Sequence, residues 1–177
     1  IFERLYHPDA KKTVLMFMNS LGKINFDDFD QKGYGNEFIS ALFEVMKFQY
    51  SIAVDDDNNT ILHISSQISK INKDNIDLMV KTIKKSKLSI LNSRNRFGET
   101  ILMKLASSGN YKAFIEIDKL KADLKYRDIY GNNILHKLIN GKGANNNNLL
   151  FLIGDIINRY PEMILQKNRK GKSPFML

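Results

Sequence analysis

Histidine is the side chain in this sequence best suited to acid–base chemistry, because an imidazole titrates near neutral pH. The chain of 177 residues contains three histidines, His7, His63 and His136. His63 and His136 each follow a leucine, at equivalent positions of a repeated segment. A catalytic residue is needed only once, so recurrence in register indicates that these two histidines serve the fold. We therefore predict structural roles for them and no catalytic residue.

Other patterns that hold metal ions or phosphates in proteins are incomplete here. Asp27, Asp28 and Asp30 offer oxygen ligands, but a calcium loop spreads its ligands over about twelve residues and ends on a glutamate. The segment 141–143, Gly-Lys-Gly, lacks the preceding glycine and the Ser or Thr of a phosphate loop. The absence of cysteine excludes disulfides and thiolate zinc sites. The sequence thus predicts no enzyme, no metal, no cofactor and no small-molecule substrate.

Basic residues form two clusters. Eight basic and two acidic residues lie between Lys70 and Arg96, for a net charge of +6, and five basic and one acidic residue lie between Arg159 and Lys172, for +4. The whole chain carries +8 at pH 7, which favours acidic partners and also arises in proteomes rich in lysine and asparagine. Because no recognised nucleic-acid-binding module occurs, we favour a solvated face, and nucleic-acid binding is the less favoured interpretation.

Length and composition describe a protein without a membrane span. At 43% apolar and 26% charged residues the chain is ordinary for a globular domain, and its length suffices for one sizeable core. No apolar run approaches the length of a transmembrane helix. The lack of cysteine fits a cytoplasmic or nuclear protein. The first residue is not methionine and no signal-peptide pattern follows it, so we interpret the chain as a piece of a longer protein.

The stretch from Asn95 to Asn110 predicts a turn and then a helix. Gly98 suits a positive φ, Thr100 suits the helix N-cap, and Gly109 suits a left-handed helix end. A second apolar run follows at once, which predicts another short helix after a tight turn. The apolar positions of the two helices are Ile101, Leu102, Leu105 and Ala106, then Ala113, Phe114, Ile117 and Leu120.

This unit recurs along the chain. Its cap residues are spaced by 40, 33 and 40 positions and are Thr60, Thr100, Asn133 and Ser173. A period near 33 with a turn and two short helices is the signature of ankyrin repeats. The chain resembles the ankyrin-repeat family from about Asp55 to its end, most clearly between Gly98 and Leu124, where Gly-x-Thr-x-Leu and Ala-x-x-Gly-Asn both appear. It departs from the family's Thr-Pro-Leu-His: isoleucine replaces the proline except at Ser173-Pro174, and Met103 replaces the histidine.

The resemblance implies an all-α solenoid in which His63 and His136 hold the turns through hydrogen bonds. We predict about four helix-turn-helix units in one domain, 1–177, with Leu102 and Leu135 buried at the start of inner helices. A helical cap or divergent repeat covers 1–52, repeats cover 53–93, 94–127 and 128–167, and a last repeat starts at 168–177. Asn36 is predicted to cap a helix that runs to about Phe48. Inserted loops are expected at 68–73 and at 141–148, the second one mobile because it is low in complexity.

Such arrays bind proteins through a curved surface, so we predict a protein–protein interaction scaffold. The chain also loosely resembles the ankyrin region of fungal cell-cycle transcription factors that act at the start of the cycle, which implies a regulatory domain of a larger nuclear transcription regulator. Viral or bacterial ankyrin proteins that capture host factors remain an alternative, as does a basic nucleic-acid-binding module.

The predicted binding residues lie at turn tips and on exposed positions of the first helices. Aromatic and arginine side chains are the usual interface anchors, and apolar residues in turns are unusual. The tip residues are Arg96, Phe97, Ile129, Tyr130, Arg169 and Lys170, and the principal helix positions are Lys104 and Lys137. The alternative is that these side chains pack between neighbouring tips. The predicted partner is a protein with an acidic surface.

Overall fold

The computed structural model describes residues 16–21, 23, 31–46, 54–68, 70–86, 90–143 and 147–176. Its regular elements are helices, and no β-strand occurs in these parts of the chain. The predicted all-α class is confirmed for the described residues. Three expectations lie outside them: His7, the acidic segment around Asp27, and the end of the second predicted helix at Phe48.

The described α-helices are short, between 5 and 13 residues long. A helical stretch at 16–21 comes first. In chain order the others are α3 (Gly35–Met46), α4 (Ile61–Ser65), α5 (Lys73–Lys85), α6 (Ile101–Ser108), α7 (Tyr111–Asp118), α8 (Ile134–Ile139), α9 (Asn147–Arg159) and the 3-10 helices η3 (Pro161–Ile164) and η4 (Pro174–Met176).

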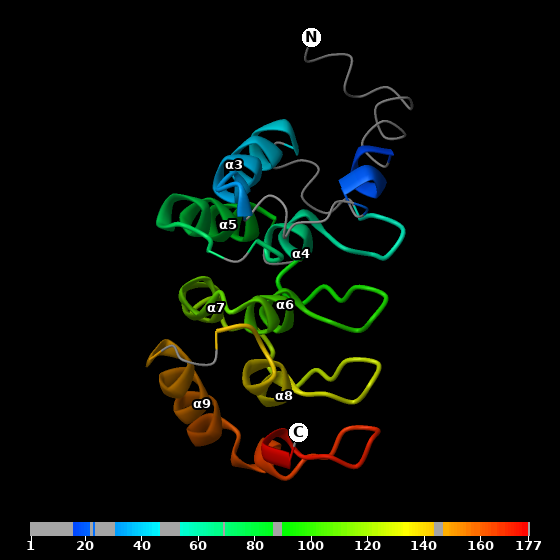
Figure 1. Cartoon of the computed structure of the whole chain (residues 1–177), viewed down its shortest axis with the longest axis vertical. Coiled ribbons are helices and arrows are strands. Elements are labelled where there is room, and N and C mark those ends of the chain that lie inside the picture. The colour runs from blue at the N-terminus through cyan, green and yellow to red at the C-terminus, as the bar shows by residue number, and fades with distance from the viewer. Residues whose placement is uncertain are drawn as a thin grey trace.

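The elements stack in layers (Figure 1). One column contains α4, α6, α8 and η4, and a second column beside it contains α5, α7 and α9. Helix α6 packs against α4 and α8, and α7 packs against α5 and α9, so each layer contacts its neighbours. Helix α3 packs on α5 and α4 at one end of the stack.

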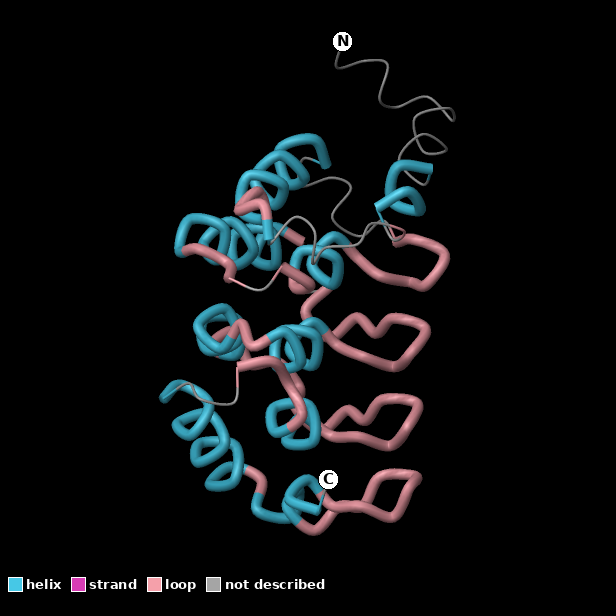
Figure 2. Tube along the Cα trace, in the orientation of Figure 1, coloured by secondary structure: helices cyan, strands magenta, loops and turns pink. Residues whose placement is uncertain are grey.

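The loop before each helix of the first column projects to the same side (Figure 2). We call these loops fingers: finger 1 (55–59), finger 2 (95–99), finger 3 (128–132) and finger 4 (168–172). The predicted start and stop signals act as expected around α6. The Thr100 hydroxyl accepts a hydrogen bond from the Met103 N–H at 3.4 Å, and Gly109 has a φ of 77°. The Asn133 side chain caps α8 in the same way, accepting from His136 N–H at 3.1 Å.

The core lies between the two columns of helices. Leu102 and Leu135 are 1% and 0% exposed, so their predicted burial is confirmed. In α9 the side chains of Leu149, Leu152 and Ile156 are also buried, which matches the helical spacing of its apolar residues.

Asn36 does not cap its helix, because α3 begins one residue earlier at Gly35. Its side chain instead binds the turn between α4 and α5: Nδ2 donates to the Lys70 carbonyl at 2.9 Å and Oδ1 accepts from Asn72 N–H at 2.8 Å. Asn75 completes the contact by donating to Asn36 Oδ1 at 3.1 Å. An asparagine at a helix start thus serves a long-range contact that local cap rules do not describe.

The prediction of a mobile loop at 141–148 is wrong in part. Lys142 N–H donates to the Ser107 carbonyl at 2.9 Å, and the Tyr111 hydroxyl donates to the Lys142 carbonyl at 3.0 Å. A Cβ at Gly141 would lie 2.3 Å from the Ala106 carbonyl oxygen, so glycine is required by close backbone packing rather than by flexibility. Residues 147 and 148 belong to α9, and 144–146 lie outside the described residues.

Candidate functional site

Each finger begins with an Asp or Asn whose side chain folds the turn. Its Oδ1 accepts hydrogen bonds from the backbone N–H groups two and four residues further along, at 2.8–3.1 Å. The four residues are Asp55, Asn95, Asp128 and Asn168. An Asp or Asn five residues before each helix cap is a sequence signal for this turn, which a prediction from caps and glycines alone does not use.

The fourth residue of every finger adopts a left-handed conformation. The φ values are 58° at Asn58, 73° at Gly98, 78° at Gly131 and 75° at Gly171. Glycine and asparagine are the residues that tolerate this region at least cost. Because all four turns have the same geometry, the two residues at each tip occupy equivalent positions.

A ladder of backbone hydrogen bonds joins the four tips. The first tip residue of each finger donates its N–H to the carbonyl of the second tip residue in the preceding finger. The three bonds run from Arg96 to Asp57 at 2.7 Å, from Ile129 to Phe97 at 2.9 Å and from Arg169 to Tyr130 at 2.9 Å. The tips therefore form one continuous row, which we call the fingertip row: 56–57, 96–97, 129–130 and 169–170.

Two arginines bind backbone carbonyls at the bases of the fingers. Arg94 donates from Nε to the Gly98 carbonyl at 3.2 Å and from Nη2 to the Arg127 carbonyl of the next unit at 3.0 Å. Arg127 repeats this pattern one unit later, with the Gly131 carbonyl at 2.8 Å and the Lys167 carbonyl. Arg94 is exposed, as expected for a residue of the predicted solvated basic face, and its guanidinium in addition binds two backbone carbonyls.

The predicted tip residues do come together along the fingertip row. Tyr130 is 57% exposed and Ile129 is 38% exposed, and both Arg169 and Lys170 are exposed beside them. Phe97 is only half-buried, and the Arg96 guanidinium stacks on its ring at 5.0 Å from the centroid. Arg96 also pairs with Asp57 of finger 1 at 2.7 Å. The tips are thus acidic in finger 1, basic and aromatic in finger 2, apolar and aromatic in finger 3, and basic in finger 4.

Lys137 and Lys104 are not free helix positions. The Lys137 ammonium lies 2.6 Å from Glu99 Oε1 and 2.9 Å from Asp128 Oδ2, and its side chain is only 16% exposed. Lys104 lies 3.8 Å from Glu99 Oε2 with its side chain 25% exposed. Lys137 is therefore removed from the predicted contact set. It joins two units, because it binds Asp128 of its own unit and Glu99 of the preceding unit, which the packing of α8 on α6 brings within its reach.

The two recurring histidines each bind the next unit. His63 Nε2 lies 3.0 Å from the Glu99 carbonyl, and His136 Nε2 lies 3.0 Å from the Lys172 carbonyl. A carbonyl oxygen only accepts, so Nε2 carries the proton in both rings. Met103 occupies the corresponding position of the middle unit and has no such donor. Lys137 joins the two units at this junction instead, through its ion pair with Glu99.

Burial determines the protonation of these imidazoles. Desolvation lowers the pKa of His63 from 6.5 to about 4, despite its hydrogen bond to the Glu99 carbonyl. Burial also lowers the pKa of His136. His63 is therefore neutral at pH 7, which suits a structural donor, and its pKa is not near neutrality as that of a general base would be. The pKa shift of His136 has the same direction and favours its neutral form.

We predict that acid weakens the fold through His63. A folded-state pKa below the unfolded value means that the unfolded chain binds the proton first, so stability is lost as pH falls from about 6.5 towards 4. A shift of this size is worth about 3 kcal/mol. Urea titrations at a series of pH values should show this loss, and His63→Gln should reduce its slope. Equal slopes for wild type and variant would contradict a neutral, buried His63.

Neither a scan against protein-family models nor a search of curated protein sequences gives a match to this chain. Within the described parts of the chain, no group of three or more His, Cys, Asp and Glu side chains is placed to hold a metal ion. Nor does any described helix have the length and apolar character needed to cross a membrane.

Proposed function

We propose that this chain is a protein-interaction scaffold of the ankyrin-repeat type, which binds its partner through the fingertip row. The observation that supports this proposal most strongly is the combination of a shared turn geometry with tip side chains that differ from finger to finger. Residues that recur, such as His63 and His136, serve the repeat. Tip residues that vary in type on an invariant frame are available to a partner.

The ladder between tips favours binding, because it orders the backbone before the partner arrives. Association then costs less conformational entropy than it would with mobile loops. The order of tip chemistry also indicates the partner. A partner surface that offers an apolar site for Tyr130 and carboxylates for Arg169 and Lys170 would match the row. This partner is a protein with an acidic surface.

The finer assignment, a regulatory domain within a larger nuclear transcription regulator, depends on the sequence resemblance alone. Under this proposal the DNA-binding parts would lie elsewhere in the protein, and this segment would act in the nucleus or cytoplasm by binding another protein. It would not be an enzyme.

The proposal predicts that Tyr130→Ala weakens partner binding by about 2 kcal/mol, or roughly 30-fold in Kd, as expected for an aromatic anchor. Stability should change little, because the side chain is exposed and the backbone hydrogen bonds of the finger remain. Partners should be captured from lysate with the wild-type chain, and their affinities then measured by titration against each variant.

The matched control is Tyr34→Ala, since Tyr34 is 60% exposed but lies before α3, away from the fingers. This control should leave the affinity unchanged. A partner that binds the Tyr130 variant as well as wild type would exclude the fingertip row. The exposed lysines of α5, at 81, 84 and 85, would then be the next surface to test.

A further inference from the structure

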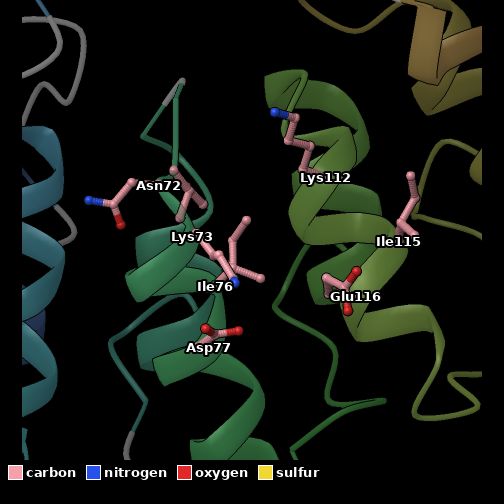
Figure 3. A pocket seen from close by; sticks show the side chains of 8 residues that line it. Asn72, Lys73, Ile76, Asp77, Lys112, Ile115 and Glu116 are labelled. Atoms are coloured by element: carbon pink, nitrogen blue, oxygen red, sulfur yellow. The ribbon is translucent and has the colours of Figure 1, made fainter.

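A groove runs between α5 and α7 (Figure 3), which belong to the column of helices farther from the fingers (Figure 1). It has a volume of about 450 Å³. Its lining includes Ile71, Lys73, Ile76, Asp77, Lys112 and Glu116. A second hollow of about 220 Å³ adjoins it at the turn between α6 and α7 and shares Ile71 and Lys112. The two hollows together form a site that is open to solvent and separate from the fingertip row.

One wall of this site is the inserted turn between α4 and α5, which two asparagines hold from opposite sides. Asn36 of α3 binds the Lys70 carbonyl and the Asn72 N–H, as described above. Asn110, before α7, accepts from the Ile71 N–H at 3.1 Å and donates to the Ile68 carbonyl. The insertion is therefore a fixed part of the structure, and the groove exists before any partner binds.

The groove combines an apolar floor with a charged rim. Ile71 and Ile76 form the floor, 8% and 4% exposed, and Ile115 lies half-buried beside them. Lys73 and Lys112 line the groove, and Lys70 and Lys112 line the second hollow. None of the three lysines forms an ion pair with another described residue.

Two carboxylates also belong to the rim of the groove. Asp77 of α5 and Glu116 of α7 each follow a lysine of the rim by one helical turn (Figure 3), and Glu116 pairs with Lys119 at 2.7 Å. The groove therefore offers both ammonium groups and carboxylates beside its apolar floor.

We propose that this groove is a second interaction site, which binds an acidic amphipathic segment of a partner protein. An apolar side chain of the segment contacts Ile71, Ile76 and Ile115, and its carboxylates pair with Lys73 and Lys112. A protein segment fits better than a nucleic acid, because Asp77 and Glu116 repel a continuous chain of phosphates. The net charge of +8 accelerates the approach of such a segment.

Fluorescein-labelled synthetic peptides test this proposal, each with one Leu, Ile, Phe or Met beside a run of glutamates. Anisotropy titrations use the full chain, the double variant K73E/K112E and the control K167E/K172E. The control has the same change in charge at exposed lysines of the last unit. The groove variant should bind about tenfold more weakly or worse, since two attractive contacts become repulsive, and the control should bind like wild type.

Three results would overturn the proposal. The first is equal weakening in both double variants, which indicates attraction to overall charge. The second is a single-stranded oligonucleotide that binds more tightly than every peptide and is lost in K73E/K112E, which assigns the groove to nucleic acid. The third is that no peptide distinguishes wild type from K73E/K112E, with thermal melts showing both chains folded. Tyr130→Ala should bind the peptides normally, so this test stands apart from that of the fingertip row.

Discussion

Replacing Lys137 with alanine is expected to lower the free energy of unfolding by about 3–5 kcal/mol. In a largely buried site it leaves Asp128 without its cation and Glu99 with only the longer contact to Lys104. The three side chains are 16%, 13% and 1% exposed for Lys137, Glu99 and Asp128. Urea unfolding monitored by circular dichroism measures the effect. Lys104→Ala is the matched control, since its 3.8 Å pair with Glu99 is long and its side chain more exposed, and it should cost less than about 1 kcal/mol.

The effect of Lys137→Ala should diminish in acid. Burial alone would raise the pKa of Glu99 and of Asp128, but the charge of Lys104 at Glu99 and the hydrogen bonds from Lys137 to both outweigh it, so both values lie below the ordinary 4.5 and 3.8. A carboxylate whose pKa is lowered in the folded state stabilises the fold at pH values above its ordinary pKa. This contribution is lost as the pH falls through the pKa of the folded state. A cost that stays constant from pH 7 to pH 3 would show that Lys137 acts through packing.

Leu135→Ala is expected to cost about 2–5 kcal/mol, and Leu102→Ala a similar amount, because each change leaves a cavity between the two columns of helices. Both side chains are almost fully buried, at 0% and 1% exposure. Denaturant titration should show a lower midpoint with an unchanged slope, which separates loss of stability from a change in the unfolded state.

Leu150→Ala is the control for these core changes. Leu150 is a helical leucine of the same repeat region that is 73% exposed on α9, so its loss should stay within about 0.5 kcal/mol. If Leu135→Ala and Leu150→Ala cost the same, the inner face of α8 is not the one that packs against α6.

Local chemistry made several features predictable from sequence. Thr100 and Asn133 lie where helices begin, Gly98 and Gly109 lie where φ is positive, and Leu102 and Leu135 lie on the buried face. Each of these assignments depends on interactions within about four residues, and a helix repeats this geometry wherever it forms. The spacing of the caps at 40, 33 and 40 positions then indicated that the units repeat.

The long polar side chains were predictable only in part. Arg94, Lys137 and Asn36 were assigned to a solvated face, a binding position and a helix cap. In the structure Arg94 binds the carbonyl of Arg127, 33 residues away in sequence, and Asn36 binds the turn at Lys70, 34 residues away. Lys137 binds the carboxylate of Glu99, 38 residues away. The partners of such side chains depend on the groups that a neighbouring unit brings within reach.

For the fingertip row and the groove, too, one part could be predicted from sequence and the other part depended on the tertiary structure. Sequence determined which residues project from the turns, because turn chemistry is local. Only the stacking of the units decided that their tips join in a ladder, and only the packing of α3 and α7 on the inserted turn formed the groove. These features depend on distances between units, which follow from how the side chains of successive layers fill the space between them.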